Sequence, residues 1–244
     1  MTIISNEQSN ANLIYWVAYN VIADDFPSVD SALRDPDGLL AIGGDLSVPR
    51  LLEAYRRGIF PWYSEGQPIL WWSPNPRCVI ELHNFRVSRS LRRKLHGGKY
   101  RVSFNCAFAE VMQQCAMPRP GSDGTWITRD VSASYLQLHK LGFAISVETW
   151  HGDVLCGGLY GVVIGKVFFG ESMFSRESDA SKIALAHLVE ALQLNNFRII
   201  DCQVHSRHLQ SLGATPMERG KFINLLNRYC AENVVYKWPG AGPH

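Results

Sequence analysis

The sequence lacks the features that define several common protein classes. Its six cysteines are widely spaced and form no Cys-x-x-Cys pair, which favours free thiols in a reducing cytoplasm over a disulfide framework. No apolar run reaches the roughly 18 residues of a membrane-spanning helix. The first ten residues also lack the basic region of a signal peptide. We therefore expect no membrane span and no signal peptide.

A large excess of one charge is also missing. The net charge is +2, which is too small to indicate nucleic-acid binding unless the basic residues cluster locally. Apolar residues make up 46% of the 244 residues and charged residues 19%, so a substantial core is expected and global disorder is not. The length fits one large domain or two smaller ones.

Several catalytic motifs are absent as well. No glycine-rich run matches a Walker loop or a dinucleotide fingerprint, and no serine lies in a Gly-x-Ser-x-Gly elbow. His205 and His208 have the spacing of two metal ligands, but no third ligand lies nearby, so a surface pair is the better interpretation. Cys202 is best interpreted as a buried structural thiol, because strand alternation turns it away from the neighbouring Asp201.

The second half of the chain alternates strand and helix patterns. Apolar strands are expected at residues 144–150, 154–164 and 167–174, with tight-turn signals between them that indicate an antiparallel meander. A helix with an apolar stripe follows, and then a buried strand at 197–204. This order matches the second half of an acetyltransferase-like fold. We therefore expect an α/β (α+β) protein with a mixed, largely antiparallel sheet.

A segment rich in aromatics and prolines separates this half from a smaller first part. The runs IFPWYS and PILWWSPNPR hold four prolines, which prevent long regular structure, so a packed loop region is expected. We place a domain boundary near residue 76, with a small N-terminal domain at 1–76 and a catalytic domain at 77–244. Residues 125–127 are expected to form a short strand, followed by a helix that Thr128 caps.

Two polar residues close the otherwise apolar strand at 197–204. Because successive side chains of a strand point to opposite faces, Asp201 and Gln203 are expected to point the same way. Glu171 interrupts a neighbouring apolar strand. The three residues make a candidate reaction centre. The alternative is that Asp201 and Gln203 only bond backbone groups at the strand end.

A basic segment without any acidic residue runs from residue 82 to residue 109. A helix is expected at 88–95, and its basic side chains are Arg89, Arg92, Arg93 and Lys94. A nucleic-acid phosphate backbone is the natural partner of such a face. A basic face in contact with solvent alone is an equally good interpretation of this segment.

One further motif is missing. Acyl-CoA enzymes of the expected fold carry Arg-x-x-Gly-x-Gly/Ala at a helix start, where backbone amides bind the pyrophosphate. Because this chain lacks that motif, we expect an acyl donor other than acetyl-CoA.

Seven collinear runs resemble one known family. They are GLLAIGGDLS (38–47), RGIFPWYS (57–64), ILWWSPNPR (69–77), GTWITRDV (124–131), GGLYGV (157–162), FGESMFSRESDASK (169–182) and DCQV (201–204). Together they resemble the leucyl/phenylalanyl-tRNA–protein transferase family. The resemblance implies a bacterial cytoplasmic enzyme of the N-degron pathway. Such enzymes move Leu or Phe, and sometimes Met, from aminoacyl-tRNA to the α-amino group of proteins that begin with Arg or Lys. A monomer without cofactor or metal is expected.

The family motifs also imply roles for single residues. Gln203 matches the residue that handles the attacking amine, and Asp201 matches its partner. The other matched positions, which line the family's pockets or lie near the site and the tRNA 3′ end, are Glu171, Phe168, Met173, Ile200, Trp62, Trp126, Tyr55 and Tyr135. Leu159 is a position that varies within the family, and it is expected to affect the shape of the pocket.

The proposed chemistry suits these residue types. The acceptor amine has a reference pKa of about 7.7–8.0, so a modest shift frees its lone pair. The amide oxygen of Gln203 can accept a hydrogen bond and aim the amine, and Asp201 can polarise Gln203 or relay a proton. Glu171 either complements the acceptor's Arg or Lys side chain or orders its loop by bonding backbone or Arg176.

Strand alternation puts Phe168 and Met173 on opposite faces. If both line one pocket, the strand must contain a bulge, and a bulge costs the least conformational free energy at Gly170. Two other functions fit the sequence less well. One is a different enzyme of the same fold, acting on a peptidoglycan precursor or using CoA, and the other is an RNA-binding protein without chemistry.

Overall fold

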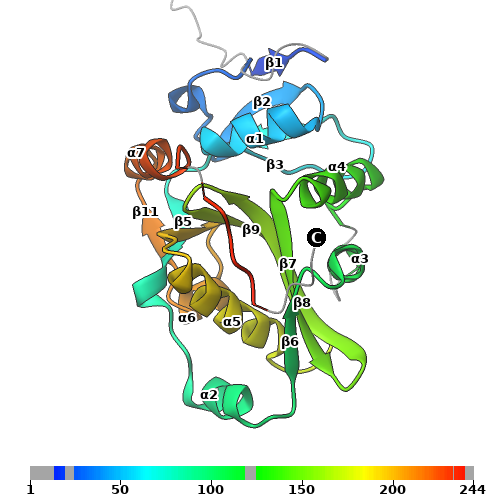
Figure 1. Ribbon diagram of the computed structural model, residues 1–244. Coiled ribbons are helices and arrows are strands. Elements are labelled where there is room, and N and C mark those ends of the chain that lie inside the picture. The colour runs from blue at the N-terminus through cyan, green and yellow to red at the C-terminus, as the bar shows by residue number, and fades with distance from the viewer. Residues whose placement is uncertain (1–13, 20–24, 119–124, 233, 240–244) are drawn as a thin grey trace, which may run out of the picture.

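The structure, a computed structural model, describes residues 14–19, 25–118, 125–232 and 234–239. Its smaller sheet lies at one end of the molecule, together with the first helix (Figure 1). The strands of this sheet, in the order β1-β2-β4-β3, are β1 (Tyr15–Val17), β2 (Leu39–Gly43), β4 (Leu70–Trp72) and β3 (Phe60–Pro61).

The larger sheet contains seven strands among the described residues. In sequence order they are β5 (Arg77–Glu81), β6 (Arg101–Phe104), β7 (Ala144–His151), β8 (Val154–Ile164), β9 (Val167–Ser175), β10 (Ile199–Gln203) and β11 (Thr215–Met217). Their spatial order is β11-β5-β10-β9-β8-β7-β6, and only β9 and β10 pair in parallel. The expected mixed, largely antiparallel sheet is thus confirmed, as is the meander of β7, β8 and β9.

Seven α-helices and two 3₁₀ helices are found in the described part of the chain. They are α1 (Val48–Arg56), α2 (Arg89–His96), α3 (Phe108–Ala116), α4 (Arg129–Lys140), α5 (Ala180–Leu194), α6 (Arg207–Ser211), α7 (Arg219–Tyr229), η1 (Val29–Ser31) and η2 (Leu82–Asn84). Thr128 caps α4 as expected, because its hydroxyl accepts a hydrogen bond from the Val131 amide at 3.3 Å. Helix α5 connects β9 to β10 and so completes the order of an acetyltransferase-like half.

Helices cover both faces of the larger sheet. On one face, the apolar stripe of α5 packs against alternate residues of the strands, among them Val147, Leu159 and Phe168. On the other face, α3 and α4 pack against the intervening residues, including Tyr160 and Phe169. Alternation along the strands therefore builds two hydrophobic layers, with the sheet between them.

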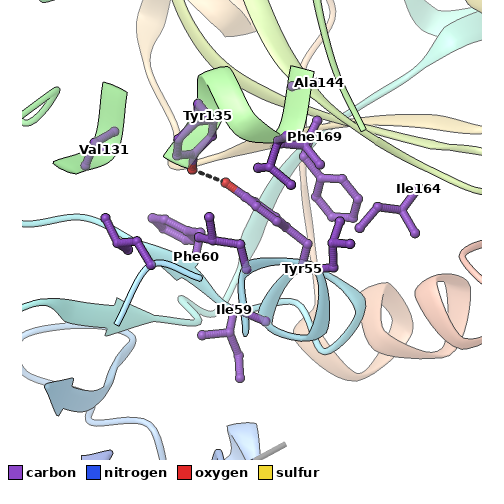
Figure 2. Packing of buried hydrophobic residues seen from close by; sticks show 14 of the residues in the cluster. Tyr55, Ile59, Phe60, Val131, Tyr135, Ala144, Ile164 and Phe169 are labelled. Carbon is purple, nitrogen blue, oxygen red and sulfur yellow. Dashed lines mark hydrogen bonds between the residues drawn. The ribbon is translucent and has the colours of Figure 1, made fainter. Parts of the chain in front are cut away.

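The hydrophobic layer beneath α3 and α4 continues into the first part of the chain. Figure 2 shows Tyr55 between Tyr135 and Phe169, and Ile59 and Phe60 belong to the same buried cluster. Helix α7 also contacts the first part of the chain, since Arg219 donates a hydrogen bond to the Ser73 carbonyl at 2.6 Å. A boundary near residue 76 stays a prediction, but the two parts share one apolar core.

Two local expectations are wrong. The aromatic segment is not only a loop, because it contributes β3 and β4. These strands have two and three residues, so they fit between the prolines, and Pro61 lies on the edge strand of its sheet, where proline is tolerated. Residues 125–127 form no strand. The Thr125 hydroxyl instead accepts from the Ile127 amide at 3.1 Å, which bends the chain.

Candidate active site

A cavity opens where two parallel strands part. Strands β9 and β10 pair through only three residues each, Val167–Phe169 with Ile199–Asp201. Beyond this point β9 stays with β8, whereas β10 stays with β5. The cavity at the divergence has a volume of about 490 Å³, and Leu159, Phe168, Met173 and Ile200 form much of its apolar wall. The four apolar residues expected to line a pocket are therefore brought together.

A bulge in β9 lets Phe168 and Met173 share this cavity. Tyr160 pairs with Ser172 and Gly161 pairs with Gly170, so Glu171 is an extra residue opposite β8. The bulge therefore lies where the sequence favoured it, next to Gly170. Because the extra residue resets the alternation, Glu171, Ser172 and Met173 all line the cavity.

A second bulge, in β10, makes the expected alternation of Asp201 and Gln203 wrong. Asp201 pairs with Val79 and Gln203 pairs with Cys78, so Cys202 is the extra residue. Gln203 has a φ of 56°, in the left-handed region. As a result Cys202 and Gln203 both line the cavity, while Asp201 is fully buried and does not line it. Cys202 is therefore turned toward the cavity and not away from it.

Asp201 forms a buried ion pair with Arg77. The Arg77 Nε and Nη2 atoms donate to the two carboxylate oxygens at 2.8 and 2.7 Å, and Nη1 donates to the Gly58 carbonyl at 3.0 Å. The guanidinium also lies over the rings of Phe60 and Phe222. This arrangement fixes both carboxylate oxygens and satisfies the charge of each partner.

The same carboxylate holds the backbone of Gln203. Asp201 Oδ1 accepts a hydrogen bond from the Gln203 amide at 3.0 Å. A left-handed conformation costs a residue other than glycine about 1–2 kcal/mol, and this charge-assisted bond offsets part of that cost. Asp201 thus determines where the Gln203 side chain enters the cavity.

Glu171 is held by two tyrosines. Tyr55 Oη donates to Oε1 at 2.6 Å and Tyr135 Oη donates to Oε2 at 3.0 Å. The two hydroxyl oxygens also lie within hydrogen-bonding distance of each other, and Figure 2 shows them pointing together. Burial raises the pKa of Glu171 to about 7, although the two tyrosines act to lower it. Burial and the charge of Glu171 in turn raise the pKa of both tyrosines well above 10.

The alternative expectation, in which Glu171 bonds Arg176, is wrong. Arg176 does not bond Glu171, because its Nε donates to the Gln114 side-chain oxygen at 2.9 Å. Tyr55 and Tyr135, which the family motifs placed near the site, are instead the groups that orient this carboxylate.

The two tryptophans expected near the site lie in different surroundings. Trp126 lines the cavity. Trp62 does not, and its side chain is 46% exposed, with its ring 5.9 Å from that of Trp72. A large exposed aromatic side chain outside the cavity is available to a partner molecule.

The four basic residues of α2 also differ from one another. Arg89, Arg92 and Arg93 are exposed. Lys94 is only partly exposed, and its Nζ pairs with Asp179 at 2.7 Å beside the start of α5. Lys94 therefore fixes the helix to the body of the protein, whereas the three arginines face solvent.

Sequence reasoning missed three residues of the site. Arg77 follows Pro76 and begins a buried strand, and a cation at such a position signals a buried carboxylate partner. Tyr160 is among the residues that line the cavity, but it lies in an apolar strand, and no pattern in the sequence marks it. His208 also lines the cavity, and burial lowers its pKa, which favours a neutral ring.

Within the described residues, no group of His, Cys, Asp or Glu side chains is placed to hold a metal ion. None of the helices described is long and apolar enough to cross a membrane.

The acetyltransferase-like order of elements, together with an apolar cavity that holds a few fixed polar groups, defines an enzyme of the transferase class. Comparison with known proteins narrows the class. Residues 79–227 match the family described as leucyl/phenylalanyl-tRNA protein transferase, and residues 44–75 match the N-terminal domain of the same family. The chain belongs to this family, and it is an aminoacyltransferase.

Individual relatives agree with the family match. The leucyl/phenylalanyl-tRNA–protein transferase of Aromatoleum aromaticum is 53% identical over 231 residues, which cover 95% of this chain and 93% of the relative. The protein of the same name from Stutzerimonas stutzeri is 55% identical over 213 residues, which cover 87% and 94%.

Solved structures are more distant. A GCN5-related N-acetyltransferase from Kribbella flavida aligns with a TM-score of 0.38 and 9% identity, covering 68% of this chain and 59% of that protein. L-PGS from Bacillus licheniformis aligns with a TM-score of 0.39 and 9% identity, covering 69% and 54%. Similarity at this level carries no argument about this chain.

Proposed function

We propose that this enzyme moves Leu, Phe or Met from aminoacyl-tRNA to the α-amino group of proteins that begin with Arg or Lys. In this proposal the reaction takes place in the cytoplasm, the enzyme acts as a monomer, and the product is marked for N-degron proteolysis. Membership of the family supports the reaction type. The observation that carries the proposal is the cavity between β9 and β10, with Gln203 and Glu171 in a largely apolar wall.

The apolar wall suits the side chain of the donor amino acid. Leu159, Phe168, Met173 and Ile200 offer a surface that takes branched and aromatic side chains alike, and methionine adapts to both shapes. Each methylene contributes only about 1–3 kcal/mol to selection in such a pocket, so a preference among Leu, Phe and Met is expected to be modest.

Gln203 is proposed to aim the acceptor amine. Its side chain faces the cavity, and its amide oxygen can accept a hydrogen bond from the amine. Alignment of the amine with an already activated ester can contribute about 7–11 kcal/mol through proximity alone. The nitrogen attacks the ester carbon, and the carbon–oxygen bond to the ribose breaks. The proton that the amine loses then restores the ribose hydroxyl.

Asp201 is proposed to act through Gln203. Because the carboxylate is buried, paired with Arg77 and turned from the cavity, it is poorly placed to take a proton from substrate. Its bond to the Gln203 amide instead keeps that residue in the left-handed conformation. Arg77 and Asp201 are therefore positioning residues in this proposal.

Glu171 supplies a carboxylate to the cavity, and both substrates bring a cation. One is the Arg or Lys side chain at the start of the acceptor protein. The other is the α-ammonium group of the donor amino acid. A carboxylate in a mostly apolar cavity attracts either cation more strongly than the same group would in water.

The tRNA is proposed to contact α2 and the exposed tryptophan. Arg89, Arg92 and Arg93 offer exposed charges for the phosphate backbone. Trp62, and Trp126 at the cavity, offer rings on which a terminal base can stack, a contact that is worth about 1–3 kcal/mol.

One assay separates this function from its rivals. The enzyme is mixed with a peptide that begins with Arg and with labelled Leu-tRNA, and in parallel with labelled acetyl-CoA. Label that enters the peptide only from the tRNA supports the proposal. Transfer from acetyl-CoA identifies a CoA acyltransferase, and tight tRNA binding without transfer identifies an RNA-binding protein.

A further inference from the structure

Two thiols face each other across the bulge of β10. The bulge places both Cys202 and Gln203 opposite Cys78 of β5. Residues that oppose each other on antiparallel strands have Cα atoms about 4.5–5.5 Å apart, which lies within the range of about 4.4–6.8 Å that a disulfide spans. Cys78 and Cys202 also pack in the same hydrophobic layer beneath α5, so their side chains share one face of the sheet. Both are free thiols.

Only one thiol of the pair is accessible from the cavity. Cys202 lines the cavity, whereas Cys78 is 2% exposed and does not line it. A small molecule that enters the cavity therefore meets Cys202 first, and Cys78 lies directly behind it. An accessible thiol with a second thiol beside it is the arrangement of a reversible oxidation site, in which one sulfur is oxidised and the other forms a disulfide with it.

The two thiols lie within hydrogen-bonding reach of each other, and this contact makes them unequal. The contact with Cys202 lowers the pKa of Cys78 against the opposing effect of burial, and the charge of the adjacent Arg77 also lowers it. The same contact, together with burial, raises the pKa of Cys202 well above its ordinary value. Because the thiolate is the nucleophile, Cys78 is suited to attack an oxidised Cys202, and the oxidation of Cys202 itself is the slower step.

A second link joins the same two strands at the bulge. Arg77 and Asp201 each precede one of the two cysteines, and their ion pair lies on the opposite face of the sheet. The ion pair holds Asp201 in place, and Asp201 in turn accepts the amide of Gln203. A covalent bond between the two cysteines must therefore be accommodated by movement of the peptide that joins Cys202 to Gln203.

We propose that Cys78 and Cys202 form a reversible oxidation site in the wall of the active-site cavity, and that its oxidant is a peroxide. In the first step the Cys202 sulfur bonds to one oxygen of hydrogen peroxide and the O–O bond breaks, which gives a sulfenic acid and water. In the second step the Cys78 sulfur attacks the Cys202 sulfur, and the sulfenic hydroxyl leaves with the Cys78 proton as water. The two thiols are oxidised to one disulfide, and the peroxide is reduced to water.

Formation of the disulfide is expected to lower transfer. It draws Cys202 from the cavity wall toward β5 and turns the peptide that carries Gln203, so the side chain that aims the acceptor amine is displaced. A misplacement of about 1 Å can lower a rate about 100-fold. A thiol reductant reopens the disulfide and restores the cavity. This effect on transfer rests on the proposed function, whereas formation of the disulfide does not.

Mass spectrometry of the whole protein tests the oxidation site. The protein is treated with hydrogen peroxide, its remaining thiols are alkylated in denaturant, and it is digested. A pair of peptides linked through Cys78 and Cys202 is expected, with a mass two hydrogen atoms below the sum of its parts, and dithiothreitol should separate them. Recovery of both cysteines as alkylated thiols, or of Cys202 as a sulfinic acid beside a free Cys78, overturns the inference.

Cys78→Ala and Cys78→Ser remove the second thiol and leave the cavity lining intact, because Cys78 does not line the cavity. Peroxide should lower transfer by the wild type about tenfold or more, and dithiothreitol should restore it. In both variants dithiothreitol should restore far less, because an oxidised Cys202 has no thiol beside it and proceeds to a sulfinic acid. Alanine and serine differ in polarity, so a result that both variants share is not an effect of packing alone. A loss that dithiothreitol reverses as fully in these variants as in the wild type overturns the inference.

A matched control removes a thiol elsewhere. Cys106 is an exposed free thiol that does not line the cavity. Cys106→Ala should keep both the linked peptides and the reversible loss of transfer. If Cys106→Ala abolishes the reversible loss, the exposed thiol is responsible for it and the inference falls.

The two readouts separate this inference from the proposed function. If Leu-tRNA donates to an Arg-starting peptide but peroxide forms no disulfide between Cys78 and Cys202, the oxidation site is wrong and the proposed function stands. If the wild type transfers nothing from Leu-tRNA, the proposed function fails, and the linked peptides still confirm or overturn the oxidation site.

Discussion

Arg77 and Asp201 lie 124 residues apart in the sequence and form a bidentate, fully buried ion pair that ties β5 to β10. The pair faces away from the cavity, yet Asp201 also accepts the amide of Gln203, which faces into it. A buried electrostatic contact is thus connected to the reaction centre through one backbone hydrogen bond. This connection separates stability from activity in a way that can be measured.

Replacement of Asp201 by Ala should destabilise the protein by about 3–5 kcal/mol, because the Arg77 charge is left buried and unpaired. The double variant Arg77→Met with Asp201→Leu should recover most of that free energy of unfolding, since it removes both charges. Transfer should stay low in the double variant, because the Gln203 amide still lacks its acceptor. Urea unfolding and steady-state transfer rates give the two quantities. Recovery of transfer together with stability would show that Asp201 serves the fold alone.

Replacement of Gln203 by Ala or by Gly should lower turnover while tRNA affinity changes little, because both variants lose the side-chain amide. The two variants should differ in stability. Gln203 has a φ of 56°, and glycine adopts this conformation without the cost of about 1–2 kcal/mol that alanine carries. Denaturant unfolding of the two proteins provides the comparison. Unchanged turnover in either variant would remove Gln203 from the mechanism.

The two bulges show what the sequence can and cannot reveal. A shared pocket for Phe168 and Met173 required a break in β9, and Gly170 indicated where it lies. No such argument was available for β10, because the bulge at Cys202 depends on a partner of Asp201 that is distant in sequence. The bulge turned Asp201 away from the cavity and Cys202 toward it.

Strand length explains the other misses. The 8, 11 and 9 residues of β7, β8 and β9 form long apolar runs bounded by tight-turn signals, and these strands were predicted. The two and three residues of β3 and β4 are too short for any period, so their pairing follows only from tertiary packing. Tyr160 was missed for a different reason, since no pattern in its apolar strand marks it.

Replacement of Arg92 and Arg93 by Ala should weaken binding to all tRNAs alike. Because each phosphate contact contributes about 0.7–0.9 to the slope of log affinity against log salt, the slope should fall by about 2 at most. Lys94→Ala is the matched control, since Asp179 already neutralises the charge of Lys94 in an ion pair. Its slope should stay closer to that of the wild type. Filter binding over a range of salt gives the slopes, and a loss restricted to one tRNA would argue against phosphate contact.

Glu171 should make stability depend on pH. Its pKa is about 7 in the folded protein, above its ordinary value of 4.5, so the folded state holds the proton more tightly than the unfolded state. Its contribution to stability is therefore fully present below about pH 4.5 and is lost as the pH rises through about 7. Glu171→Gln removes this titration.

The melting temperature of Glu171→Gln relative to the wild type should accordingly rise between pH 4.5 and pH 7 and then level off. Thermal unfolding of both proteins in one buffer series gives the difference. A difference that stays constant over this window would show that Glu171 titrates at its ordinary pKa.

The most direct test of the central claim is the mass of an Arg-starting peptide after incubation with the enzyme and Leu-tRNA. The peptide should gain one leucine residue, and fragmentation should place it on the α-amino group, before the Arg. Gln203→Ala, at equal tRNA occupancy, should give far less of this product. A peptide of unchanged mass, or leucine attached to a side chain, would contradict aminoacyl transfer to protein N-termini at this cavity.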